Sequence, residues 1–243
     1  MSETVEIRNC EKHGDYSAKV FEAMGRKIEM RCPECEKERT EKEEEANRLE
    51  AINKKNMESA RRRKNMIEAG FIPRYLGVTL ENFKPTDDQK AAYDACVLFA
   101  LKFEEMCESG KTLIFCGTVG TGKTMLVHAL MQSVWCGRYL RAVDISRMVR
   151  DCYSKNESEH DLIQGLASTK LLVIDEVGVQ QDTKHEGVLI TDLIDRRYGN
   201  LLPTIICSNL NKEKLKETFG DRAWDRLTQN SAIIPILGKS QRG

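Results

Sequence analysis

The sequence lacks the features that direct a chain into a membrane or a secretory pathway. No apolar run approaches the roughly 18 to 20 residues that cross a bilayer, and the opening residues MSETVEIRNC contain no signal-peptide core. Neither sign of charge is in excess, because Lys and Arg together number 38 and Asp and Glu also number 38. A strongly basic coat for nucleic acid is therefore excluded, although a local basic patch is not. We expect a soluble, cytoplasmic protein with no membrane partner.

The sequence also lacks the cysteine pattern of a disulfide-stabilised protein. It has 9 cysteines, an odd number, and no secretion signal accompanies them. Six are scattered through apolar or helical stretches, where a reduced cysteine acts as a small hydrophobic residue. The other three lie within the first 35 residues, namely Cys10, Cys32 and Cys35.

The chain divides by composition into an N-terminal part, residues 1–70, and a globular part, residues 71–243. Residues 36–70 are dense in charge, contain no proline and end at Gly70, so they predict one long exposed helix. With 243 residues, 40% of them hydrophobic, the chain can build one full core and a small appendage. We therefore expect an N-terminal arm at 1–70 and one larger domain at 71–243.

The globular part alternates short apolar strands with segments of helical periodicity. Such alternation predicts an α/β fold, with a five-stranded parallel sheet covered by helices on both faces. The expected strands are 112–116, 139–143, 170–175, 203–207 and 232–237.

A glycine-rich loop follows the first of these strands and precedes a helical segment. Glycines let successive backbone N–H groups point at phosphate oxygens at a helix N-terminus. The lysine of this pattern places a positive charge on the β- and γ-phosphates, and the hydroxyl after it is a ligand for Mg²⁺. The loop predicts ATP binding by Gly117, Thr118, Val119, Gly120, Thr121, Gly122, Lys123 and Thr124.

Polar residues end two other predicted strands. The apolar run before Asp175 and Glu176 would bury its strand and deliver both carboxylates to its carboxyl end. We expect Asp175 to help hold Mg²⁺ and Glu176 to polarise the attacking water. Asn209, after the strand 203–207, would hydrogen-bond that water or the γ-phosphate. This adjacent acid pair favours hydrolysis over phosphoryl transfer to a small molecule.

The N-terminal cysteines fall into two close pairs, Cys10-x-x-His13 and Cys32-x-x-Cys35. Three thiolates and one imidazole fit a tetrahedral Zn²⁺ ion, and four protein ligands close its coordination shell. The segment is too small to build a core alone, so the metal would supply folding energy. We predict a structural zinc site here, with no catalytic role.

With these motifs in place, residues 71–243 resemble the AAA+ ATPases of the DnaC/IstB-like group, which comprises replicative-helicase loaders and transposition-helper ATPases. The matching stretches are GTVGTGKT, LLVIDEVGVQ, Ile194 to Arg197, ICSNL and Gly220 to Leu227. The resemblance implies an AAA+ core without a helical lid. It also implies that Arg226 reaches the γ-phosphate of a neighbouring subunit, with Arg222 nearby, and that Arg242 senses nucleotide.

The resemblance implies an ATP-dependent loader of the hexameric replicative DNA helicase onto single-stranded DNA, with self-assembly in the ATP state. The N-terminal arm would contact the helicase. One alternative is an IstB-like transposition helper that acts on duplex DNA; another is a zinc-bearing adaptor that uses nucleotide as a switch, without turnover. A kinase is less consistent with the arginine pair and Asn209. The basic run Arg61 to Lys64 is either a DNA contact or a solvated helix end.

Overall fold

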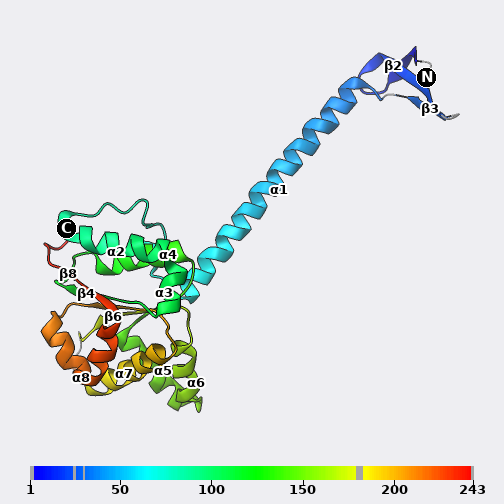
Figure 1. The fold of residues 1–243 in the computed structure, drawn as a ribbon. Helices are drawn as coiled ribbons and strands as arrows, with labels where there is room; N and C mark the ends of the chain where they lie inside the picture. The colour runs from blue at the N-terminus through cyan, green and yellow to red at the C-terminus, as the bar shows by residue number, and fades with distance from the viewer. Residues whose placement is uncertain (1–2, 24–25, 30, 179–182, 242–243) are drawn as a thin grey trace. The chain divides into compact units, whose positions relative to one another are not determined.

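The computed structural model describes residues 3–23, 26–29, 31–178 and 183–241. The chain forms two compact units, an N-terminal unit of Met1–Arg62 and a C-terminal unit of Arg63–Gly243. Figure 1 shows the elements of each unit along the chain. Among the described helices, none is long and apolar enough to cross a membrane.

The N-terminal unit contains an antiparallel sheet that was not expected from the sequence. Its strands are β1 (Glu3–Cys10), β2 (Gly14–Ala23) and β3 (Arg26–Glu29), in the order β1-β2-β3. The register pairs Cys10 with Gly14, whose φ of +77° suits the tight turn between β1 and β2. Ala18 and Val20 of β2 are buried, whereas Val5 and Ile7 of β1 are 63% and 79% exposed.

A single helix, α1 (Pro33–Glu68), follows this sheet and confirms the predicted long helix. None of its side chains is buried, as expected for a segment so dense in charge. Gly70 ends it with a φ of +90°, and the N–H of Phe71 donates to the carbonyl of Met66. This is the glycine-terminated geometry that closes many helices.

The C-terminal unit is built on the parallel sheet that the sequence predicted. Its five strands run in the order β5-β6-β7-β4-β8, and every neighbouring pair is parallel. The predicted α/β fold is confirmed. The strand bounds are β4 (Thr112–Gly117), β5 (Arg138–Arg141), β6 (Leu172–Val177), β7 (Thr204–Ser208) and β8 (Ser231–Ile236).

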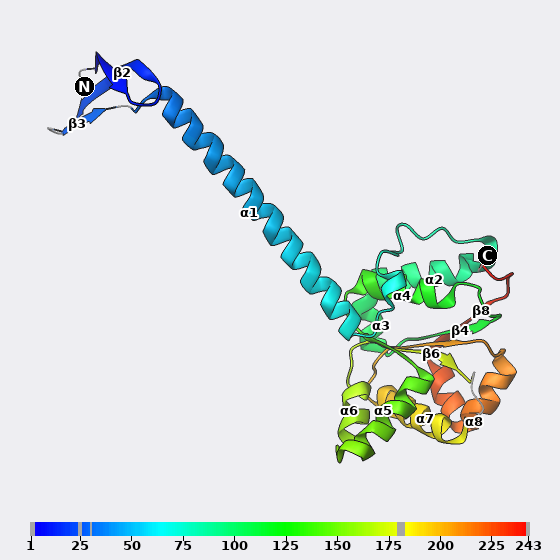
Figure 2. The ribbon, with the colours of Figure 1, turned by 180° about the vertical axis from the view of Figure 1, so that it is seen from behind.

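Helices cover both faces of this sheet, and Figure 2 shows the same two layers from behind. Helices α2, α3 and α4 pack on one face, and α5 to α8 pack on the other. Side chains of β4 alternate between the two cores, with Leu113 and Phe115 in the first and Ile114 in the second. The bounds are η1 (Pro73–Tyr75), η2 (Asp87–Gln89), α2 (Lys90–Leu101), α3 (Phe103–Ser109), α4 (Lys123–Val134), α5 (Ala142–Lys155), α6 (Glu159–Ala167), α7 (Thr183–Gly199) and α8 (Lys212–Gln229).

One titratable side chain, His128 of α4, lies wholly inside the first core. It is 0% exposed, and neither ring nitrogen has a hydrogen-bond partner. Its ring packs against Phe71, Tyr75 and Tyr139, with centroid separations of 5.3, 5.2 and 4.4 Å. Burial lowers the pKa of His128 to about 4. The imidazole is therefore neutral at physiological pH and acts as an aromatic core residue.

This buried histidine predicts an acid-sensitive C-terminal unit. The pKa of His128 is about 4 when folded and 6.5 when unfolded, so the unfolded chain binds the proton first as the pH falls. The free energy of unfolding should decrease below pH 6.5, by about 2 kcal/mol at pH 5. His128→Phe should remove that decrease. Urea unfolding at pH 7.5 and pH 5, followed by fluorescence of Trp135 and Trp224, measures it.

The exposed His160 supplies the matched control, His160→Phe. This control should keep the pH dependence of the wild type. Parallel pH profiles for His128→Phe and the wild type would show that His128 does not carry the effect.

Candidate nucleotide and metal sites

The glycine-rich loop connects β4 to α4, as the sequence predicted. Gly120 and Gly122 have φ values of +81° and +84°, a left-handed conformation that side chains disfavour. Lys123 begins α4 and is only 6% exposed. Its ammonium group donates hydrogen bonds to the carbonyl oxygens of Gly117 (3.0 Å) and Thr118 (2.7 Å). These hydrogen bonds hold the Lys123 side chain against the glycine-rich loop at the carboxyl end of the sheet, where ligands of such folds bind.

Two distant segments hold this loop through hydrogen bonds, and neither contact could be predicted from the sequence motifs. The buried Gln89 donates from Nε2 to the carbonyl of Thr121 at 2.8 Å. After β8, the N–H of Gln241 donates to the carbonyl of Gly120 at 2.8 Å, and the Thr118 hydroxyl donates to the carbonyl of Gly238 at 3.0 Å. The conformation of the loop therefore depends on contacts with residues that lie far from it along the chain.

Asp175 lies beside the loop and accepts three hydrogen bonds. Its Oδ2 accepts from the hydroxyls of Thr124 (2.7 Å) and Tyr139 (2.8 Å), and its Oδ1 accepts from the N–H of Glu176 (2.7 Å). The carboxylate is 3% exposed. Oxygen donors of this kind suit Mg²⁺, so the residues present fit the ion that accompanies ATP. Thr124 would hold it directly and Asp175 through its coordinated water.

Glu176 follows at an irregularity of the sheet. The β6–β7 register shifts between Ile174 and Val177, and Glu176 has a φ of +58°. A bulge of this kind turns a side chain away from the regular alternation. Its side chain is exposed, so a water molecule could reach the carboxylate. Backbone strain at a non-glycine residue is typical of functional sites.

Ser208 ends the neighbouring strand β7, and Asn209 follows it directly. The Ser208 hydroxyl donates to the carbonyl of Val177 at 2.7 Å, which joins the ends of β6 and β7 just beyond the bulge. Asn209 is half-buried directly after this contact. The carboxyl ends of β4, β6 and β7 thus bring the predicted lysine, acids and asparagine to one edge of the sheet.

The predicted arginines lie on α8, after a kink at Gly220. Gly220 has φ 74° and ψ 164°, outside the helical region. Arg222 is exposed. Arg226 forms an ion pair with Asp195 of α7 in its own chain. Arg242, predicted to sense nucleotide, lies outside the described residues.

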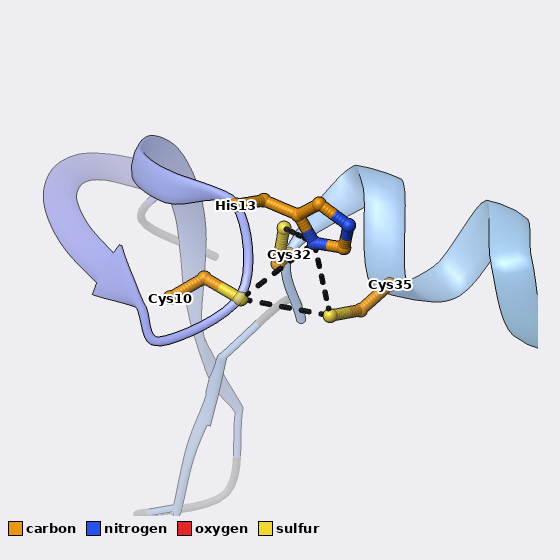
Figure 3. Close-up of side chains that lie close together, drawn as sticks. All are labelled: Cys10, His13, Cys32 and Cys35. Atoms are coloured by element: carbon orange, nitrogen blue, oxygen red, sulfur yellow. Dashed lines mark hydrogen bonds between the residues drawn. The ribbon is translucent and has the colours of Figure 1, made fainter.

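The cysteines and histidine of the N-terminal unit converge, as Figure 3 shows. Cys10 ends β1, His13 lies in the turn before β2, Cys32 precedes α1, and Cys35 lies in the first turn of α1. The Cys10 and Cys35 sulfurs are 3.6 Å apart, and His13 Nδ1 lies 3.3 Å from Cys35 and 3.7 Å from Cys32. All four ligand atoms lie within 4.8 Å of one another.

The separations of 3.3 to 3.7 Å are close to those between ligands of a tetrahedral zinc ion. Zn–S bonds of about 2.3 Å and Zn–N bonds of about 2.0 Å place tetrahedral ligands roughly 3.5 to 3.8 Å apart. Backbone N–H groups of Lys12 and His13 lower the pKa of the Cys10 thiol to about 6, which favours the thiolate. On the other side of the His13 ring, Nε2 lies 3.2 Å from a carboxylate oxygen of Glu38, an arrangement that orients metal-binding histidines.

Comparison with known proteins identifies the family of the chain. A family model described as "IstB-like ATP binding protein" matches residues 34–243. The chain belongs to this family. Its membership implies nucleotide binding and ATPase activity. The match begins at Glu34, so Cys10, His13 and Cys32 lie outside it.

Curated relatives include helicase loaders of bacteria. The replicative helicase loader DnaC of Escherichia coli (strain K12) is 28% identical over 203 residues, which cover 81% of this chain and 81% of that protein. The DnaC of Buchnera aphidicola subsp. Schizaphis graminum is 30% identical over 178 residues, 68% of this chain and 69% of that protein. The resemblance to helicase loaders predicted from the motifs is therefore confirmed.

Solved structures match the fold. A crystal structure of the DnaC helicase loader has a TM-score of 0.61 at 23% identity, covering 68% of this chain and 99% of that chain. A replication initiator DnaA bound to AMPPCP and single-stranded DNA has a TM-score of 0.58 at 22% identity, covering 69% and 51%. These likenesses support the α/β fold of the C-terminal unit, with its five-stranded parallel sheet.

Proposed function

We propose that this chain is an ATP-dependent loader that places the hexameric replicative DNA helicase on single-stranded DNA. The observation that carries the proposal is the homology to DnaC helicase loaders over most of the chain. In this proposal the groups that ATP hydrolysis needs are supplied by Lys123, Thr124, Asp175 and Glu176. In this proposal ATP and Mg²⁺ are the cofactors of the C-terminal unit and Zn²⁺ that of the N-terminal unit.

The polar groups at the sheet edge have separate roles in the proposal. Lys123 and the loop N–H groups bind the phosphates, and Thr124 and Asp175 hold the magnesium ion that neutralises phosphate charge when bound. Glu176 accepts a proton from the attacking water, since its carboxylate is exposed and a water molecule can approach it. Asn209 positions that water or the γ-phosphate.

Self-assembly would complete this site. Arg226 is proposed to reach the γ-phosphate of a neighbouring subunit, with Arg222 one turn earlier on α8. A planar guanidinium that arrives from a neighbour stabilises transition-state charge and makes hydrolysis depend on assembly. In the single chain, Asp195 accepts from Arg226, so assembly would have to exchange this ion pair for the phosphate.

Residues 1–70 are proposed as the arm that contacts the helicase, and residues 71–243 as the ATPase domain. The division into two compact units, one holding the Cys/His cluster and the other the phosphate loop, supports separate roles for them. DNA contact through Arg61 to Lys64 stays a hypothesis, favoured only by the exposure of these side chains.

Co-migration with the hexameric replicative helicase of its host, in the presence of ATP, tests the proposal. We expect a stable complex with the wild type and with the half-buried cysteine variant Cys136→Ser. Cys32→Ser, which removes a zinc ligand, should lose the complex. No complex in any sample, with ATP-dependent filaments on duplex DNA instead, would overturn the loader in favour of a transposition helper.

A further inference from the structure

Tyr139 contacts both the candidate nucleotide site and the residues that follow α1. It lies on β5, paired with Val173 of β6, and it is 5% exposed. Its hydroxyl donates to Asp175 Oδ2 at 2.8 Å, the oxygen that also accepts from Thr124. No motif pointed to this tyrosine, because its partner lies on the neighbouring strand.

The main chain of Tyr139 makes a second connection. Its N–H donates to the carbonyl of Ala69 at 2.8 Å, one residue beyond the end of α1. Gly70 approaches so closely that a Cβ there would lie 2.0 Å from the carbonyl oxygen of Tyr139. Only glycine permits this approach, and its φ of +90° independently favours glycine.

The ring of Tyr139 is held by the same segment. It packs on His128 at 4.4 Å, and His128 packs in turn on Phe71 and Tyr75, which follow Gly70. The chain from Ala69 to Tyr75 therefore fixes both the backbone and the ring of the residue whose hydroxyl binds Asp175.

We propose that Tyr139 is a positioning residue of the ATPase site, which holds Asp175 for Mg²⁺ and ties that carboxylate to the segment directly after α1. The inference rests on the proposed ATPase function. A carboxylate that orients magnesium-bound water must keep one rotamer, and each donor to its oxygens restricts it. Burial and the charge of Asp175 raise the pKa of the Tyr139 hydroxyl, so it remains a donor.

Tyr139→Phe tests the hydroxyl, because it keeps the ring, the contact with His128 and the backbone bond to Ala69. We expect the Mg²⁺ concentration needed for half-maximal binding of a fluorescent ATP analogue to rise about tenfold. Binding at saturating Mg²⁺ should change little. A tyrosine that only filled the core would alter thermal stability without moving this Mg²⁺ dependence.

Tyr153→Phe is the matched control, since Tyr153 is 65% exposed and its hydroxyl contacts Glu159 on the surface. It should bind like the wild type. An unchanged Mg²⁺ dependence in Tyr139→Phe, with normal nucleotide binding by the wild type, would overturn the positioning role alone. A wild type that binds no nucleotide would overturn the ATPase proposal and this inference with it.

Gly70→Ala tests the connection to the segment after α1. Its added Cβ should displace Tyr139 and raise the required Mg²⁺ concentration. In the double variant with Tyr139→Phe the two effects should not add, because they act through one hydroxyl. Gly220→Ala is the control for backbone strain. Like Gly70, Gly220 has a positive φ, but a Cβ added there has no neighbouring atom within 4 Å. Fully additive effects would overturn the connection.

Discussion

Lys123→Ala is expected to lower the affinity for ATP by about 100-fold or more. Two effects combine: the phosphates lose a charged donor, and the loop loses hydrogen bonds from Lys123 to Gly117 and Thr118. Each hydrogen bond to a charged group contributes roughly 1.5 to 3 kcal/mol. The two effects together therefore correspond to a loss of affinity for ATP of about 100-fold or more. Equilibrium binding of a fluorescent ATP analogue measures it, and normal binding would refute the assignment of the phosphate loop.

Glu176→Gln is the companion variant, and it is expected to keep ATP binding but lose hydrolysis. It removes the proposed base but keeps the shape of the side chain at the bulge, so ATP should still bind. Hydrolysis should slow by at least about 100-fold, the usual contribution of a general base. Together the two variants separate binding from chemistry. Hydrolysis left unchanged by Glu176→Gln would refute the role of Glu176 as the base, whereas negligible hydrolysis by the wild type would favour a nucleotide switch without turnover.

The parts of this site that could be predicted from sequence are the local ones. A phosphate loop is one continuous segment, and the buried run before Asp175 needs only its own hydrophobicity to define a strand. The bounds were less accurate. The strand expected at 170–175 runs from Leu172 to Val177, and the one expected at 139–143 ends at Arg141, because α5 begins at Ala142.

Contacts between distant segments could not be predicted. Gln89, Gly238 and Tyr139 support the loop or Asp175 through single hydrogen bonds, and no local pattern records such a partner. The ion pair of Asp195 with Arg226 depends likewise on how α7 packs on α8. The periodicity of apolar residues predicts which face of a helix or strand is buried, but it does not predict which polar group of a distant segment will contact that face.

The sheet of the N-terminal unit was missed for another physical reason. Strand prediction relies on alternation between a buried apolar face and a solvated polar face. In β1 the apolar residues Val5 and Ile7 alternate with polar ones, but they are exposed, so the burial that such a pattern implies is missing. Most pairs between β1 and β2 include a polar residue, such as Arg8 with Tyr16. The clustered ligands, in contrast, were readable because metal spacing is a local signal.

Removal of zinc is expected to unfold the sheet of the N-terminal unit while ATP binding persists. Among the side chains described in this unit, only Ala18, Val20 and Cys32 are buried. The burial of these three side chains alone cannot offset the entropy of ordering the segment. Structural zinc contributes about 10 to 16 kcal/mol of apparent binding free energy near pH 7, far more than these side chains supply.

Zinc content and amide hydrogen exchange check this prediction. The wild type should hold one zinc per chain, and the amides of β1 and β2 should be protected. A chelator, or Cys32→Ser, should abolish both, whereas Cys136→Ser should preserve both because Cys136 lies outside the cluster. The C-terminal unit has its own cores on both faces of its sheet, so its nucleotide binding should survive chelation. Protection of β1 and β2 that persists without metal would show that the sheet folds without zinc.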